Sequence, residues 1–200
     1  MKLSAIILTQ NQQQMLPNCL KSIQGLVDEI IICDRNSTDD TLSIAKKANA
    51  KIVKYSGQYF DEWRNLATQA AKSEWILYID ADERLTPSLK KEIKKIVISS
   101  EVEKSSKFSA YQISRQNYWW GKEFTHCGAS PDFVTRLIKK DKLKKWQGII
   151  HESPIIDGDI GTLKNKMLHF THRDLISGLQ KSYQWTKLEA QLFYQAGHKC

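Results

Sequence analysis

Three acidic side chains lie within four positions, directly after a short apolar segment. Asp80, Asp82 and Glu83 follow the run Trp75–Ile79. Carboxylates held this close repel one another unless a cation lies among them. Oxygen ligands of this kind favour Mg²⁺ or Mn²⁺, ions that keep part of their water and bridge to phosphate groups. We therefore expect a divalent metal site at Asp82, with a solvated acidic cap on the next helix as the alternative.

Polar side chains also follow the first two apolar segments of the chain. Thr9 and Asn11 come after the first of these segments, and Asp34 comes after the second. The carboxyl ends of parallel strands meet at one edge of a sheet, so these side chains are expected on the same edge as Asp80. An edge of this composition suits a nucleoside.

The usual phosphate-binding loops are missing from the sequence. No GxGxxG follows the first apolar segment, and no GxxxxGKS/T occurs anywhere. The sequence therefore argues against a dinucleotide-dependent dehydrogenase and a P-loop enzyme, because both classes bind phosphate through these loops. A diphosphate would instead be neutralised by a metal at Asp82 together with Arg64, which lies early in a predicted helix.

The elements that must position these side chains alternate in type through the first half of the chain. Short runs rich in Ile and Val are typical of buried parallel strands, and apolar residues at spacings of three, four and seven predict helices between them. The predicted strands are Leu3–Leu8, Ile30–Cys33, Lys51–Tyr55 and Trp75–Ile79. The alternation predicts an α/β fold with a doubly wound sheet and a crevice at the carboxyl ends of its strands.

The second half of the chain has a different character. Residues 109–151 are aromatic and strand-like, which predicts antiparallel strands added to the sheet. Within them, Trp119 and Trp120 could stack on sugar rings, but a tryptophan pair in a strand is more often core, and we expect one of the two to be buried. Leucines from Leu175 onward recur at helical intervals to near the C-terminus.

Composition and charge narrow the class of protein. The 200 residues are 41% hydrophobic and carry a net charge of +8, which indicates one globular domain with an affinity for anions. No run approaches the about 18 apolar residues of a membrane span, and the N-terminus lacks a secretory signal, so we expect a cytoplasmic protein. The lysine run Lys139–Lys145 is either a solvated hairpin tip or a contact with anionic lipid at the inner membrane or with a phosphorylated glycolipid acceptor.

Taken in order, these motifs resemble the family 2 glycosyltransferases of GT-A fold. The motifs of the first half are Ile7-Leu8-Thr9-x-Asn11, Asp34-x-x-Ser37-Thr38-Asp39, Trp63-Arg64-Asn65 and Trp75-x-Leu77-x-Ile79-Asp80-Ala81-Asp82-Glu83. In the second half, Arg115-x-Asn117-Tyr118, Pro131-Asp132, Arg136-Leu137 and His151-Glu152 resemble the WaaE-type branch of lipopolysaccharide core glucosyltransferases. The resemblance covers most of the chain.

The resemblance implies a fold and a reaction. The fold would be one GT-A domain over residues 1–200, a Rossmann-like mixed sheet with helices on both faces and an appended antiparallel and helical region. Residues 1–98 would bind the nucleotide sugar and residues 108–200 the acceptor. An inverting enzyme of this family moves a sugar from a nucleotide-sugar donor, here most readily a UDP-sugar, to an acceptor hydroxyl on a cell-envelope glycolipid or glycan. Mg²⁺ or Mn²⁺ would bind the donor diphosphate.

The resemblance also implies roles for single residues. Thr9, Asn11 and Asp34 would contact the nucleoside, Asp80 would lie on the ribose side, and Asp82 would bind the metal.

The reaction further needs a base for the attacking hydroxyl. We prefer Asp132, the only acid between Gly128 and Arg136, with Glu152 as the runner-up beside an imidazole. His169 or His172 would add a nitrogen ligand to the metal, the alternative for both being an ordinary, partly buried histidine.

Two other functions are weighed against this one. A sugar nucleotidyltransferase also uses an α/β sheet and a metal, but it needs a glycine-rich loop near the N-terminus, which is absent here. A non-enzymatic basic module that binds nucleic acid fits the charge of +8. Aromatic residues are not interleaved with the lysines, however, so we expect no nucleic-acid partner.

Overall fold

Strands and helices alternate through the first half of the chain, as the apolar pattern predicts. The computed structural model describes residues 2–102, 107–126, 131–148, 152–171 and 174–195. The helices are α1 (Leu16–Ile23), α2 (Thr41–Lys47), α3 (Phe60–Ala70), α4 (Pro87–Val102), the 3-10 turn η1 (Lys140–Lys142) and α5 (Leu175–Gln195). The strands are β1 (Leu3–Thr9), β2 (Glu29–Asp34), β3 (Lys51–Lys54), β4 (Trp75–Tyr78), β5 (Glu83–Leu85), β6 (Ala110–Trp119), β7 (Lys122–Glu123), β8 (Asp132–Lys139), β9 (Leu143–Gln147), β10 (Ser153–Ile156), β11 (Ile160–Thr162) and β12 (Met167–Phe170).

One mixed sheet organises the molecule. Its strand order is β3-β2-β1-β4-β8-β6-β12-β5, with β7 and β11 paired to β6. The first four strands are parallel, whereas β8 runs antiparallel to both β4 and β6. β9 and β10 form a separate two-stranded antiparallel sheet. The predicted mixed α/β sheet with antiparallel additions is therefore confirmed.

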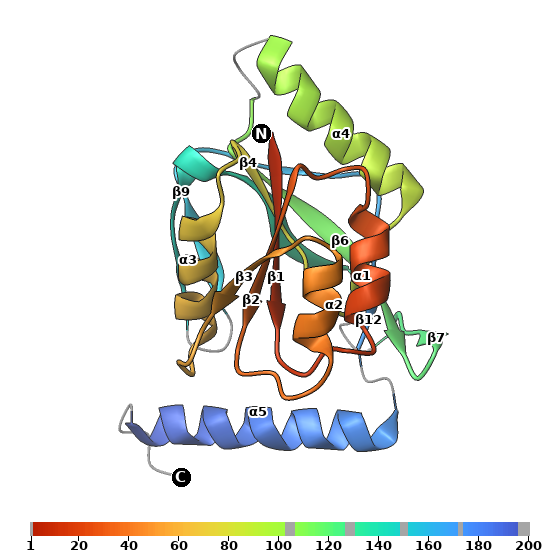
Figure 1. Ribbon diagram of the computed structural model, residues 1–200, viewed down its shortest axis with the longest axis vertical. Helices are drawn as coiled ribbons and strands as arrows, with labels where there is room; N and C mark the ends of the chain where they lie inside the picture. The colour runs from red at the N-terminus through yellow and green to blue at the C-terminus, as the bar shows by residue number, and fades with distance from the viewer. Residues whose placement is uncertain (1, 103–106, 127–130, 149–151, 172–173, 196–200) are drawn as a thin grey trace.

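Helices cover both faces of the sheet because its central strands are apolar on both sides. Alternate residues of a strand point to opposite faces. In β1, Leu3, Ala5 and Ile7 pack in one core with α1, α2 and α4, whereas Ile6 and Leu8 pack in a second core with α3. Figure 1 shows α1, α2 and α4 on one side of the central strands and α3 with β9 on the other.

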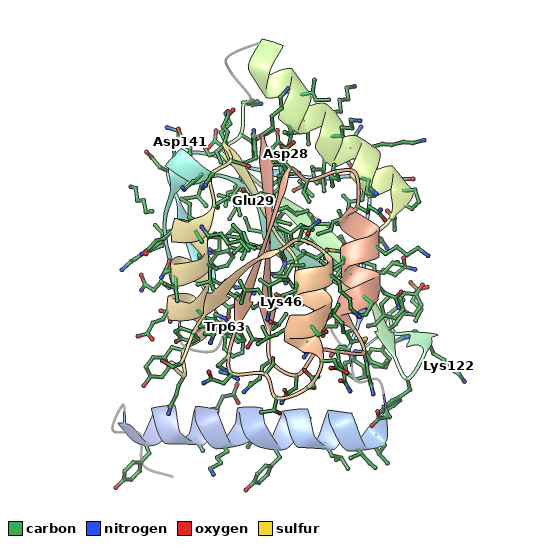
Figure 2. The ribbon with its side chains drawn as sticks, in the orientation of Figure 1. Asp28, Glu29, Lys46, Trp63, Lys122 and Asp141 are labelled. Atoms are coloured by element: carbon green, nitrogen blue, oxygen red, sulfur yellow. The ribbon has the colours of Figure 1, made fainter. Side chains whose placement is uncertain are left out.

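The lysine run lies at the opposite edge of the sheet from the acidic residues. Lys139 pairs with Trp75 at the start of β4, and the Lys140 amide donates to the Glu74 carbonyl. Asp80 follows the other end of the same strand. Figure 2 places Asp141 at the upper edge, at which β1 begins. The lysine turn is therefore remote from the acidic residues.

The long helix α5 lies across the edge at which the parallel strands end, below the loops that follow them (Figure 1). Several of its apolar side chains are exposed, among them Leu175, Ile176, Leu179 and Tyr183. No helix in the described part of the chain combines the length and the apolarity needed to cross a membrane.

The tryptophan pair belongs to the hairpin that joins β6 to β7. Trp120 is 56% exposed, and Trp119 is only half-buried. Our expectation that one of the two lies in the core is wrong. Trp119 is the last residue of β6, and Trp120 lies in the turn that follows it. Both residues are at the tip of the hairpin, away from the two cores that pack on the central strands.

Candidate active site

The loops after β1 and β2 are tied together by the side chains that the sequence singled out. Asp34 accepts hydrogen bonds from the Thr9 hydroxyl (2.9 Å) and from the Ser37 amide (2.9 Å). The Thr38 amide donates to the Asn11 side-chain oxygen at 2.8 Å. Thr9 and Asp34 are fully buried, whereas Asn11 is exposed in the left-handed conformation that asparagine tolerates. Thr9 and Asp34 therefore build the loops, and Asn11 is the side chain of the three that a ligand can reach.

Asp80 lies between two arginines. Its Oδ1 accepts from Arg64 Nη2 at 3.2 Å, and its Oδ2 accepts from Arg136 Nη2. Burial by itself would raise the pKa of this carboxyl, but the two guanidinium groups outweigh it and hold the pKa well below its usual range. The arginines therefore favour the ionised form of Asp80.

Glu83 is the second acidic residue with arginine partners. Its side chain is fully buried, Oε1 accepts from Arg136 Nη2 at 2.6 Å, and Oε2 accepts from the Asp80 amide at 2.9 Å. We expected the repulsion among three neighbouring carboxylates to be relieved by a metal ion. At Asp80 and Glu83, positive charge is supplied by Arg64 and Arg136.

A β-bulge places Arg136 between these two acids. Leu137 pairs with Tyr111, but Thr135 pairs with Gln112, so Arg136 is the extra residue in β8. A bulge of this kind turns a side chain away from its regular direction and is common beside active sites. The sequence motif included Arg136 without giving it a role, because a bulge depends on pairing with a distant strand.

Arg64 joins the acidic cluster to Glu152. Its Nε donates to Glu152 Oε1 at 2.7 Å, and its guanidinium lies 4.8 Å from the centre of the Trp146 ring. The Arg64 side chain is 4% exposed and the Glu152 side chain 12%. Among the described residues, Arg64 Nη1 is buried with no hydrogen-bond partner. The structure thus brings Arg64, Asp80 and Glu152 together, with Arg64 beneath the surface.

Asp132 is held by a bidentate arginine pair. Arg115 donates from Nε and Nη2 at 2.9 and 3.1 Å, and Asn117 Nδ2 donates at 3.0 Å. Burial would raise the Asp132 pKa, but these hydrogen bonds outweigh it and lower the pKa. A carboxylate with a lowered pKa is a weak proton acceptor. These contacts argue against the base role expected for Asp132.

His169 and Asp82 lie together, as the sequence led us to expect. His169 Nε2 is 3.6 Å from Asp82 Oδ2, and its Nδ1 is 2.7 Å from Asn117 Oδ1. Because Asn117 Nδ2 donates to Asp132, its Oδ1 must accept, which puts a proton on His169 Nδ1 and turns Nε2 toward Asp82. With neutral imidazole, Nε2 and the Asp82 carboxylate are both potential ligands of a cation. His172 and His151 lie outside the described residues.

The donor set fits a metal that is shared with a ligand. No group of three or more His, Cys, Asp or Glu side chains that could enclose a metal occurs within the described ranges. Mg²⁺ and Mn²⁺ commonly take one or two protein ligands and complete their shell with water and phosphate oxygens. Asp82 and His169 are a pair of this type.

The arginine-bound carboxylates predict a loss of stability in acid. A carboxylate whose pKa is lowered by folding stabilises the native state above its unfolded pKa of about 3.9, and that contribution is lost as the pH falls further. Asp80 and Asp132 both belong to this class. We expect the free energy of unfolding to fall below about pH 4, by up to about 1.4 kcal/mol per pH unit for each such group.

Urea unfolding at pH 3, 4, 5 and 7, followed by tryptophan fluorescence, measures this dependence. The Asp132→Asn variant should show a shallower fall than the wild type. Equal slopes for the two proteins would contradict the assignment.

Known proteins are similar to this chain in sequence. An uncharacterized glycosyltransferase of Rickettsia prowazekii is 29% identical over 193 residues, which are 94% of this chain and 62% of the relative. The lipopolysaccharide core biosynthesis glycosyltransferase LpsC of Rhizobium meliloti is 24% identical over 205 residues, 98% of this chain and 73% of LpsC. The chain thus spans about three fifths of the first of these relatives.

A solved structure has the same fold. The crystal structure of S. aureus TarS 1-349 in complex with UDP-GlcNAc superimposes with a TM-score of 0.62 at 18% identity, covering 86% of this chain and 59% of that TarS fragment. The model of the family named "Glycosyl transferase family 2" matches residues 4–154. Because that match includes more than half of the chain, and the fold agrees, this chain belongs to glycosyl transferase family 2.

Proposed function

We propose that this chain is the catalytic part of a metal-dependent, inverting glycosyltransferase that moves a sugar from a UDP-sugar to a glycolipid or glycan of the cell envelope. The Asp82–His169 pair is the observation that carries the proposal. The UDP-GlcNAc bound to TarS supports the donor class, and the name of LpsC supports a lipopolysaccharide core acceptor. Family membership favours this function over a sugar nucleotidyltransferase or a nucleic-acid-binding module.

The two halves of the chain would divide the work. Residues 1–98 would bind the nucleotide, with exposed Asn11 at the nucleoside and Asp80 on the ribose side. Residues 108–200 would bind the acceptor. Thr9 and Asp34 would act by fixing the loops, because their side chains are buried.

Asp82 and His169 would hold Mg²⁺ or Mn²⁺ on the donor diphosphate. When bound, the ion supplies positive charge at the departing diphosphate. Asn117 would keep His169 in the tautomer that offers Nε2. Arg64 would act from below by orienting Asp80 and Glu152, in place of the direct diphosphate contact that we expected from the sequence.

Glu152 is the better candidate for the base. Among the described residues its ion-pair partner is Arg64, which also binds Asp80. Asp132 is occupied by Arg115 and Asn117 and is a weaker proton acceptor. Glu152 would take the proton of the acceptor hydroxyl as it attacks the sugar.

Titration calorimetry of UDP with and without Mn²⁺ tests the metal assignment. We expect Mn²⁺ to raise the affinity of the wild type for UDP by about tenfold or more, and the Asp82→Asn variant to lose this gain because its amide cannot neutralise the cation. Asp157→Asn, the same change at an exposed residue, is the matched control. Equal Mn²⁺ dependence in wild type and Asp82→Asn would refute the proposal.

A further inference from the structure

The turn between β6 and β7 has an unusual residue in a demanding conformation. Trp120 and Gly121 both have positive φ angles, 50° and 76°. They connect strands in which Trp119 pairs with Lys122. Two-residue turns of this kind favour Asn-Gly, since a bulky side chain is strained in the left-handed region. Burial does not explain the tryptophan, because its side chain is 56% exposed.

Three aromatic rings gather at this end of the hairpin. The rings of Trp119 and Phe124 stack with their centres 4.2 Å apart and their planes within 5°. The Trp120 ring meets Trp119 edge to face, with centres 6.3 Å apart. The exposed Trp120 ring therefore rests against a rigid aromatic pair. We call Trp119, Trp120 and Phe124 the aromatic ledge.

The ledge continues the face of β6 that carries the candidate active site. Arg115, Asn117 and Trp119 are alternate residues of one strand, so their side chains leave the same face of the sheet. Phe124 lies opposite Asn117, to whose carbonyl its amide donates at 2.8 Å. At about 3.3 Å per residue, Trp119 lies roughly 7 Å along the strand from Asn117, so the ledge is close to the polar residues of this face.

The chemistry of the ledge suits a carbohydrate better than a lipid. Aromatic faces stack on apolar C–H surfaces, and pyranose rings present such surfaces beside hydroxyl groups. Lys122 and Glu123 are exposed next to the ledge and can bond to hydroxyls. Inserting the hairpin tip into a membrane would instead require both charges to leave water.

We propose that the aromatic ledge is an acceptor subsite that stacks on a pyranose ring of a glycan, next to the sugar that receives the donor residue. This inference rests on the proposed function for its role in catalysis. It adds a place for the acceptor, which neither the metal assignment nor the base assignment supplies. It also explains why a tryptophan occupies a strained position in the turn, since strained residues are common at ligand-binding sites.

A binding experiment without donor tests the ledge independently of catalysis. Labelled wild-type protein is applied to a printed array of bacterial oligosaccharides, and the strongest binder is then titrated with each variant. Trp120→Asn is the main variant, because asparagine is preferred in this turn. We expect its melting temperature to equal or exceed that of the wild type, while its affinity for the oligosaccharide falls about tenfold or more. Ile98→Ala, which removes an exposed apolar side chain of α4 in the other half of the chain, should bind as the wild type.

The outcomes separate this inference from the proposed function. A wild type that binds no oligosaccharide on the array, or a Trp120→Asn variant that binds as well as the wild type, would overturn the subsite. The subsite would also be overturned if the wild type bound vesicles of 3:1 phosphatidylcholine and phosphatidylglycerol and the Trp120→Asn variant did not. The ledge would then be a membrane contact. UDP titration of the same variants reports on the donor site alone. A wild type that does not bind UDP would count against the proposed function and would leave the conclusion from glycan binding unchanged.

Discussion

The Glu152→Gln variant should bind UDP as tightly as the wild type and transfer sugar about 10²- to 10⁴-fold more slowly, the range typical of losing a general base. Glutamine keeps the shape of glutamate and an oxygen that can accept from Arg64 Nε, which lies 2.7 Å from Glu152 Oε1. The arginine should therefore stay in place, and Asp80 with it. What the variant lacks is a carboxylate that can take the proton of the acceptor hydroxyl.

Steady-state transfer to a defined acceptor, together with calorimetric titration of UDP, measures the two expected effects. The comparison variant is Asp132→Asn, which removes the other candidate carboxylate. We expect Asp132→Asn to act mainly on stability, because it leaves Arg115 without its bidentate partner. A Glu152→Gln variant with wild-type kcat, alongside an inactive but fully stable Asp132→Asn, would show that the base is Asp132.

The Arg136→Met variant should lose about 3–5 kcal/mol of the free energy of unfolding, the cost typical of breaking a buried ion pair on one side. The Arg136 side chain is 5% exposed, and its Nη2 binds both Asp80 and Glu83. Methionine fills much of the same space without the charge. Glu83 is fully buried, so its carboxylate would remain without its nearest cation in a medium of low dielectric constant.

Urea unfolding monitored by fluorescence gives the change in free energy. Lys21→Met is the matched control, because it removes an exposed charge, and it should change stability by less than about 0.5 kcal/mol. The double variant Arg136→Met with Glu83→Gln should recover part of the loss, since glutamine is neutral. A loss below about 1 kcal/mol for Arg136→Met would mean that the acids tolerate each other without this arginine.

The partnership of arginines and acids changes how the acidic triplet is understood. The sequence placed three carboxylates together and required a cation among them. Cations are present, and two of them are arginine side chains. Arg64 and Arg136 form ion pairs with Asp80, and Arg136 also forms an ion pair with Glu83. Asp82, beside His169, is the residue of the triplet that we assign to the proposed metal.

The sequence alone determined the four parallel strands of the first half, and the edge of the sheet at which the candidate site residues follow them. Runs of Ile and Val fix strands and helical spacing fixes helices, because both follow from local periodicity and the burial of apolar groups. β1 through β4 fall within about one residue of their predicted bounds. The acids after β4 could likewise be placed at the edge shared with Asn11, because parallel strands all end there.

Only the tertiary structure decided which side chains meet. Arg136 and Asp80 are 56 residues apart, Arg64 and Glu152 are 88 apart, and Asn117 and His169 are 52 apart. Contacts at such separations depend on strand order, register and the bulge at Arg136, none of which leaves a periodic trace in the sequence. The position of the lysine turn at the far edge has the same origin, because the antiparallel pairing of β8 with β4 carries that turn away from Asp80.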